Sequence, residues 1–279
     1  MSENKDIVIH YFDGALPEVI AEAEGEVSRV AVMGHRLSGN NPFRHNIFEL
    51  GVHIFEIQKS PARFVKSIAR QRWFNDPGGD LPDYVFERAE VSREEVEGQS
   101  IDGEALQKLL EGIEVIIAHD AGALRPFMEK ILPELEKSLF GCSRNQVDWR
   151  SKGFESRSLH YLSRDHGWWF ENDSSLAECA AIVKLLNEED DESGRSYLDE
   201  LIGRCQEPLI EVEAKATPRD RRLLSKEFFK FSPRDQVWYR VMGESTLKRV
   251  RATLENRGFE GELREKERLP ATERFRRDF

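Results

Sequence analysis

Short apolar, β-branched runs alternate with helical spacing through the first two thirds of this chain, and this alternation constrains the fold most strongly. Buried strands are expected at residues 27–33 and 114–118, because each run is short and largely apolar, and residues 48–57 are expected to form the strand paired to the first. Apolar residues recur at helical spacing in residues 101–110, 124–135 and 176–186. Strands that alternate with helices predict an α/β fold, in which a mixed sheet is flanked by helices.

An acidic, polar stretch closed by glycine, residues 187–194, is the clearest boundary signal in the sequence. It divides the chain into an N-terminal segment (1–26), a first domain (27–187), an acidic linker with a connecting segment (188–208) and a small α+β domain (209–279). The small domain is expected to hold strands at 209–214, 228–231, 237–241 and 259–264, with helices at 218–226 and 245–257. Ser245 is the expected N-cap of the last helix, and Gly258 is the expected residue just beyond its end.

Charge is unevenly distributed along the chain, and this favours one end as a surface for a polyanion. The formal net charge of the 279 residues is −11. Residues 208–279 contain 18 Lys and Arg against 13 Asp and Glu, a net of +5, which leaves −16 for the rest. A protein that bound nucleic acid over its whole surface would more often be basic. The C-terminal domain is therefore the expected site of nucleic-acid binding.

The cysteines and the apolar runs indicate a cytoplasmic protein. Cys142, Cys179 and Cys205 are widely spaced, without a CxxC pair, and are expected to be buried, reduced thiols. The first residues lack the basic start and apolar run of a secretory signal. No apolar stretch approaches the roughly 20 residues that a membrane span needs.

Three segments in order carry a resemblance to a known family. They are VAVMGHRLSGNNPFRHNIFELGVHIFE (30–56), VIIAHDAGALRPFMEKILPEL (115–135) and WFENDSSLAECAAIVKLL (169–186). The sequence resembles the DnaQ-like (DEDDh-type) 3′–5′ exonucleases, which include RNase T and the proofreading subunit of DNA polymerase III. The resemblance covers about residues 27–186 and implies a ribonuclease H-like domain. The segment FFKFSPRDQVWYRV (228–241) is also similar to a C-terminal module of some bacterial members.

The resemblance also implies a catalytic site, and this chain departs from it at most positions. In the family, four carboxylates hold two Mg²⁺ or Mn²⁺ ions, and a histidine is the general base. The family's carboxylates fall here on Gly34, Arg36, Leu124 and Glu178, and its histidine falls on Asp173. Only Glu178 remains a carboxylate at a ligand position, and a guanidinium repels metal ions.

We therefore expect a catalytically inactive exonuclease-like protein, without a metal or other cofactor, that acts as a nucleic-acid-binding or protein-interaction module. In the family's geometry Arg36 would approach Glu178, and we expect the two side chains to form an ion pair in place of the metals. One alternative is an active exonuclease with displaced ligands such as Asp120, Glu171, Asp173 and Glu178. Another is a regulatory or structural partner that binds no nucleic acid.

Cationic and aromatic residues in the C-terminal domain are the expected nucleic-acid contacts, because phosphates and bases require both kinds. They are Arg222, Lys230, Arg234, Trp238, Arg240, Lys248 and Arg249. A solvated charged face over an ordinary core remains the alternative explanation.

Three further features are expected to be structural. His119 should be a satisfied interior histidine, and Asp173 should cap the helix that follows it. Trp168 and Trp169 should belong to the core and its rim.

Overall fold

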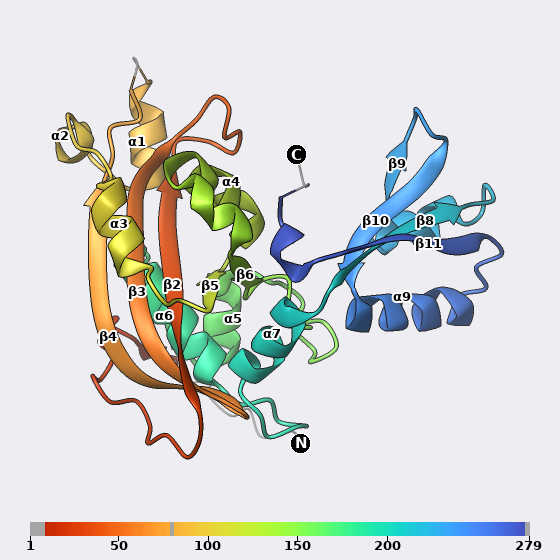
Figure 1. Cartoon of the computed structure of the whole chain (residues 1–279), viewed down its shortest axis with the longest axis horizontal. Helices are drawn as coiled ribbons and strands as arrows, with labels where there is room; N and C mark the ends of the chain where they lie inside the picture. The colour runs from red at the N-terminus through yellow and green to blue at the C-terminus, as the bar shows by residue number, and fades with distance from the viewer. Residues whose placement is uncertain (1–8, 79–80, 277–279) are drawn as a thin grey trace, which may run out of the picture.

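A five-stranded mixed sheet forms the centre of the larger, N-terminal part of the structure, the main body (Figure 1). The computed structural model describes residues 9–78 and 81–276; residues 1–8 of the expected N-terminal segment and 277–279 of the expected small domain lie outside this range. The strand order is β4-β3-β2-β5-β6. The strands are β2 (Val27–Leu37), β3 (Ile47–Lys59), β4 (Ala62–Phe74), β5 (Val115–Ala118) and β6 (Leu139–Cys142). Because β2 pairs antiparallel with β3 but parallel with β5, the predicted mixed sheet is confirmed.

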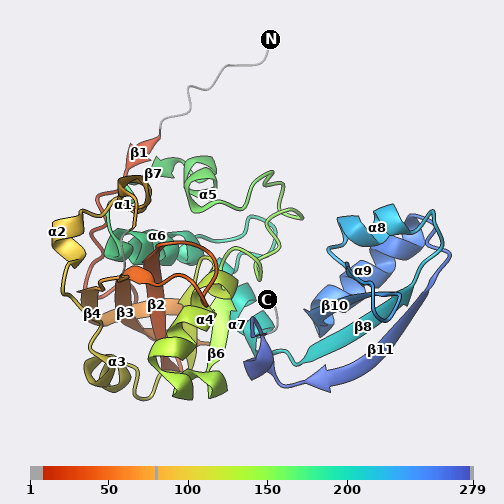
Figure 2. The same ribbon diagram turned by 90° about the horizontal axis from the view of Figure 1, so that it is seen from above.

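Helices cover both faces of this sheet, because successive residues of each strand point to opposite sides (Figure 2). In β2, Val30 and Val32 belong to one apolar cluster, and Ala31 and Met33 belong to the other. The first cluster is completed by α5 (Leu159–Asp165), α6 (Ser175–Asn187) and α7 (Tyr197–Gln206). The second is completed by α3 (Gly103–Leu109), α4 (Ala121–Ile131) and the 3-10 helix η1 (Pro133–Lys137). Short helices α1 (Asp83–Ala89) and α2 (Arg93–Val96) lie over a smaller cluster around Phe48.

Segments on both sides of the expected first domain belong to the same core, which corrects the expected boundaries. The buried side chains of α7 include Leu198 and Leu201, which belong to the first apolar cluster together with α6. Residues 197–206 are therefore not a linker. On the other side, β1 (His10–Tyr11) pairs in parallel with β7 (Trp168–Trp169). Phe12 and Leu16 then pack against the same cluster. The main body therefore extends from residue 9 to about residue 206 across the described residues.

The small C-terminal module is a four-stranded antiparallel sheet with two helices on one face. Its strands, in the order β11-β8-β10-β9, are β11 (Glu262–Leu269), β8 (Leu209–Lys215), β10 (Val237–Gly243) and β9 (Lys230–Ser232). Helices α8 (Arg221–Lys226) and α9 (Glu244–Asn256) supply buried leucines and valines to its core. The expected hairpin is present as β9–β10, and Gly258 follows α9 with φ of 70°. Gly243, not Ser245, is the N-cap of α9, because β10 continues directly into the helix.

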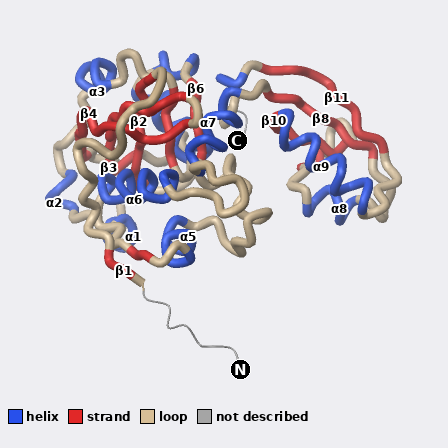
Figure 3. Tube along the Cα trace, turned by 90° about the horizontal axis from the view of Figure 1, so that it is seen from below, coloured by secondary structure: helices blue, strands red, loops and turns tan. Residues whose placement is uncertain are grey.

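After β11 the chain returns to the main body (Figure 1). Hydrogen bonds of Arg125 and Arg274 hold it there. The segment includes the 3-10 helix η2 (Ala271–Glu273), and Phe275 packs against the second apolar cluster, to which α4 contributes. Arg125, which is 0% exposed, donates from Nη1 to the carbonyl of Arg274 at 2.8 Å. Arg274 in turn donates to the carbonyls of Arg204 and Glu207. The small module is therefore attached to the main body at both of its ends (Figure 3).

The three cysteines are buried, as the sequence predicted. Cys142, Cys179 and Cys205 are all buried and free. Burial raises the pKa of the Cys142 thiol to about 11 and that of Cys205 to about 12, so both are protonated. No helix in the described parts of the chain combines the length and hydropathy needed to cross a membrane.

Candidate functional site

Three of the positions that resemble the exonuclease ligands, Gly34, Arg36 and Glu178, lie where the end of β2 meets the first turn of α6. Gly34 lies on the same face of β2 as Val30 and Val32, so it faces α6. A Cβ atom added at Gly34 would lie 2.1 Å from the carbonyl oxygen of Ser175 and 2.9 Å from Cβ of Glu178. Its cross-strand partner Gly51 approaches Ser175 in the same way. The two glycines let the helix lie directly on the sheet, and no side chain fits at position 34 in this backbone.

Arg36 occupies the space beside this contact and binds the remaining ligand-position carboxylate. Its Nη1 lies 3.2 Å from Oε2 of Glu178, and the two residues are only 9% and 8% exposed. The same oxygen accepts the backbone N–H of His35 at 2.9 Å. The expected Arg36–Glu178 ion pair is therefore confirmed, and it is buried.

The second terminal nitrogen of Arg36 fixes the segment that leads into α6. Its Nη2 donates to the backbone carbonyl of Asn172 at 2.6 Å and to the Oδ1 atom of the same residue at 2.9 Å. Charged hydrogen bonds of this kind are stronger than neutral ones and are directional. Arg36 thus connects β2, the segment before α6 and α6 itself.

Glu49 is a buried carboxylate of this site that the sequence analysis missed. It is 0% exposed on β3, and its Oε1 accepts hydrogen bonds from the N–H and the hydroxyl of Ser175, both at 2.7 Å. Nε of Arg72 on β4 lies 2.6 Å from the same oxygen. Glu49 therefore satisfies donors at the start of α6. Its one sequence signal is an acidic residue inside the apolar strand FELGVHIF.

The other two positions do not complete a ligand set. Leu124 is 0% exposed in α4 and belongs to the cluster on the opposite face from α6. Asp173 is exposed and precedes the helix cap. The cap itself is Ser174, whose side chain accepts from the N–H of Ala177, so the expectation that Asp173 caps α6 is wrong.

The residues of this site do not fit a pair of divalent cations. A glycine with no room for a side chain, a guanidinium and a leucine stand at three of the four ligand positions. Within residues 9–78 and 81–276, no three His, Cys, Asp or Glu side chains are grouped as metal ligands. Of the displaced set, Asp120 caps α4 and binds Arg144 at 2.8 Å.

His119 and the Trp168–Trp169 pair are structural, as expected from the sequence. His119 is 8% exposed, and its ring nitrogens contact Oγ of Ser143 and the carbonyl of Arg157, both at 2.9 Å. Burial lowers its pKa to about 4, so the ring is neutral near pH 7. Trp168 is buried and Trp169 is 37% exposed, as expected of core and rim.

The structure does not bring the expected nucleic-acid contacts together on one face of the small module. Trp238 and Arg240 pair with Ala214 and Val212 of β8, so they lie on the helix-covered face, whereas Lys230 pairs with Tyr239 on the opposite face. Several of the cations have partners within the chain. Arg240 donates to the carbonyl of Glu227, Arg249 contacts the Glu227 carboxylate at 3.3 Å, and Lys248 lies 3.8 Å from Glu244. Arg222 and Arg234 are exposed.

A cation–aromatic contact joins the module to the main body and was not expected from the sequence. Phe228 is 62% exposed and has φ of 58°. The guanidinium carbon of Arg157, from the main body, lies 5.7 Å from its ring centre, and that of Arg240 lies 5.8 Å away. Phe231, 44% exposed, packs at 5.6 Å from the ring of Trp238. This cation–aromatic surface, formed by Arg157, Phe228, Phe231 and Arg240, spans the junction of the two parts.

Comparisons with known proteins find similarity in structure alone. No protein-family model matches the sequence, and no curated protein matches it. The structure is similar to E. coli exonuclease I in complex with a dT13 oligonucleotide, with a TM-score of 0.52 and 10% identity over 82% of this chain and 70% of that one. A metal-free exonuclease I–single-stranded DNA complex gives a TM-score of 0.51 and 9% identity over 84% and 67% of the chains.

A full-length 3′-exonuclease is also similar, with a TM-score of 0.44 and 12% identity over 58% of this chain. This chain spans 60% of the length of that protein. At such low identity the two exonuclease I likenesses, with TM-scores of 0.52 and 0.51, show the fold alone.

Proposed function

We propose that this chain, which has the fold of the DnaQ-like 3′–5′ exonucleases, binds nucleic acid without cutting it. The observation that carries the proposal is the buried Arg36–Glu178 pair, in which a guanidinium lies at a position that resembles a metal ligand. In an active enzyme two divalent ions activate water and stabilise charge on the scissile phosphate. A fixed guanidinium can neutralise Glu178 but supplies no nucleophile. We further propose a cytoplasmic location, because the three thiols are free.

The first prediction is that the purified full-length chain degrades neither DNA nor RNA. Single-stranded and double-stranded substrates with labelled 5′ ends should stay intact in Mg²⁺ or Mn²⁺, under conditions in which E. coli exonuclease I trims its substrate. The reason is that Gly34, Arg36 and Leu124 offer no oxygen ligand for a hard cation. Metal-dependent 3′ trimming that disappears in Glu178→Ala would overturn this part of the proposal.

The cation–aromatic surface supports the binding part of the proposal. Exposed aromatic rings stack on bases of any sequence, and nearby guanidinium groups contact phosphates. Phe228 and Phe231 supply the rings, and Arg157 supplies a cation from the main body. Exonuclease I was solved with a single-stranded oligonucleotide, so a single strand is the first ligand to test.

The second prediction concerns this binding. Phe228→Leu should weaken the binding of a single-stranded oligonucleotide by about tenfold, because one base–ring stack contributes about 1–3 kcal/mol. Arg222→Ala with Arg234→Ala should weaken it and reduce the slope of log affinity against log salt by about 0.7 for each phosphate that is no longer neutralised. Fluorescence anisotropy at several salt concentrations measures both effects.

A control variant and the use of point variants make this test specific to the small module. Lys108→Ala removes an exposed cation of α3 in the main body and should leave the affinity unchanged. Point variants are preferable to deletion of the module, because deletion would remove the Arg274 carbonyl from the buried Arg125. If Phe228→Leu binds like the parent chain, the cation–aromatic surface is assigned wrongly, and if the Arg222 and Arg234 double variant does, these two cations are assigned wrongly.

A further inference from the structure

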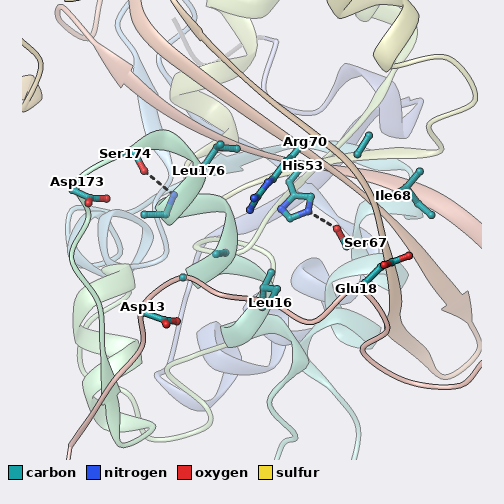
Figure 4. Close-up of a pocket in the computed structure, with 14 residues that line it drawn as sticks. Asp13, Leu16, Glu18, His53, Ser67, Ile68, Arg70, Asp173, Ser174 and Leu176 are labelled. Atoms are coloured by element: carbon teal, nitrogen blue, oxygen red, sulfur yellow. Dashed lines mark hydrogen bonds between the residues drawn. The ribbon is translucent and has the colours of Figure 1, made fainter.

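A cleft of about 560 Å³ lies beside α6, between the N-terminal segment and strands β3 and β4 (Figure 4). Of the five exonuclease-like positions, Asp173 lines the cleft, whereas Gly34, Arg36, Leu124 and Glu178 do not. Its apolar lining comes from Leu16 of the N-terminal segment, from Ile68 and Ala69 of β4, and from Leu176, Ala177 and Ala180 of α6.

Acidic side chains dominate the charged lining of this cleft. Asp13, Glu18 and Asp173 are exposed carboxylates on its wall, whereas Arg70 is the cation among its lining residues. His53, 5% exposed, contacts Oγ of Ser67 at 2.8 Å. Burial, and then the charge of Arg70, lower its pKa to about 4, so the ring is uncharged near pH 7. The cleft therefore presents net negative charge over an apolar floor.

An exposed aromatic pair, Tyr11 and Trp169, lies close in sequence to two of these carboxylates. Tyr11 and Trp169 face each other across the β1–β7 pairing, with ring centres 4.7 Å apart. They are 54% and 37% exposed. Desolvation, and then the charges of Glu171, Asp173 and Asp13, raise the pKa of the Tyr11 phenol. Asp13 lies two residues from Tyr11 in the sequence and Asp173 four residues from Trp169, and both carboxylates line the cleft.

We propose that this cleft and the Tyr11–Trp169 pair bind a lysine- or arginine-bearing segment of a partner protein. The carboxylates attract the cationic heads, the aromatic faces favour a cation over them, and the apolar floor accepts the aliphatic stems. The same carboxylates repel phosphates, so a nucleic-acid strand does not suit this surface. The chain outside residues 208–279 carries a net charge of −16, which also favours the approach of a basic segment.

Calorimetry on the full-length chain, with a basic peptide of alternating lysine, arginine and glycine, tests the proposal directly. Asp13→Asn combined with Asp173→Asn should weaken binding by about tenfold, because two favourable charge interactions are removed. Trp169→Leu should weaken it by about twofold to fivefold, because leucine offers no aromatic face to the cation. Asparagine retains the side-chain oxygen that accepts the N–H of Ala15, so the local turn should persist.

A matched control distinguishes the effect of the cleft's carboxylates from the effect of the protein's net charge. Glu104→Gln with Glu111→Gln removes two exposed carboxylates elsewhere on the main body and should leave peptide affinity unchanged. Equal weakening by both pairs, or no binding of the peptide, would overturn the proposal. Equally tight binding of free spermine would also overturn it, because the site would then recognise small cations. Loss of oligonucleotide binding in the Asp13 and Asp173 double variant would show that the cleft belongs to the nucleic-acid surface instead.

Discussion

Gly34→Asp, which restores a carboxylate at a position resembling a metal ligand, should unfold or severely destabilise the protein rather than create a metal site. The new Cβ would lie 2.1 Å from a backbone oxygen of α6, and the carboxylate would lie beside Glu178. Overpacking in a core commonly costs about 1–3 kcal/mol. A buried, unpaired charge adds several more. We expect a total loss of about 5 kcal/mol or more, measured by urea unfolding.

Two variants separate the contributions to this loss. Gly34→Ala introduces the collision without the charge and should account for a large part of the effect. Gly25→Asp adds the same side chain at a glycine whose Cβ would meet nothing within 4 Å, so its stability should match the parent chain. A stable Gly34→Asp protein that binds Mn²⁺ would contradict this account of the site.

Arg36→Ala should lower the free energy of unfolding by about 3–5 kcal/mol, because it leaves Glu178 buried without its cationic partner. The backbone and side-chain oxygens of Asn172 would also lose their donor. In a double-mutant cycle with Glu178→Gln, the combined loss should be clearly smaller than the sum of the two single losses.

An exposed ion pair of similar length provides the comparison for Arg36. Arg251 and Glu265 are 3.0 Å apart, but their side chains are 42% and 40% exposed. Arg251→Ala should therefore cost only about 0–1 kcal/mol. Additive effects of Arg36 and Glu178 would reject the coupling inferred from the 3.2 Å contact.

The sequence predicted the sheet centre well but missed strand β4. Strands β2, β3 and β5 are recognisable because their residues are buried on both faces. In contrast, β4 is an edge strand whose second half, from Ser67, is exposed or half-buried and rich in arginine. Polar edge strands of this kind have no apolar signature, although charge on an edge is favourable in itself.

The candidate site was predictable only as far as the resemblance extended. Arg36 and Glu178 could be paired because the fold brings β2 and α6 together. Glu49 could not be recognised, because its role depends on the close approach of Ser175 to Gly51. In the small module, strand register decides which cations share a face, and register is not readable from charge alone.

The double attachment of the small module has a consequence for the order of folding. Domains generally fold from the N-terminal side as the chain is synthesised. Here Arg125, buried near the middle of the sequence, obtains one of its acceptors only from Arg274, 149 residues later. The main body can collapse earlier, but a charged donor in its interior stays incompletely satisfied until that last segment emerges. Nascent or truncated chains that lack it should therefore be the species most exposed to proteases and chaperones.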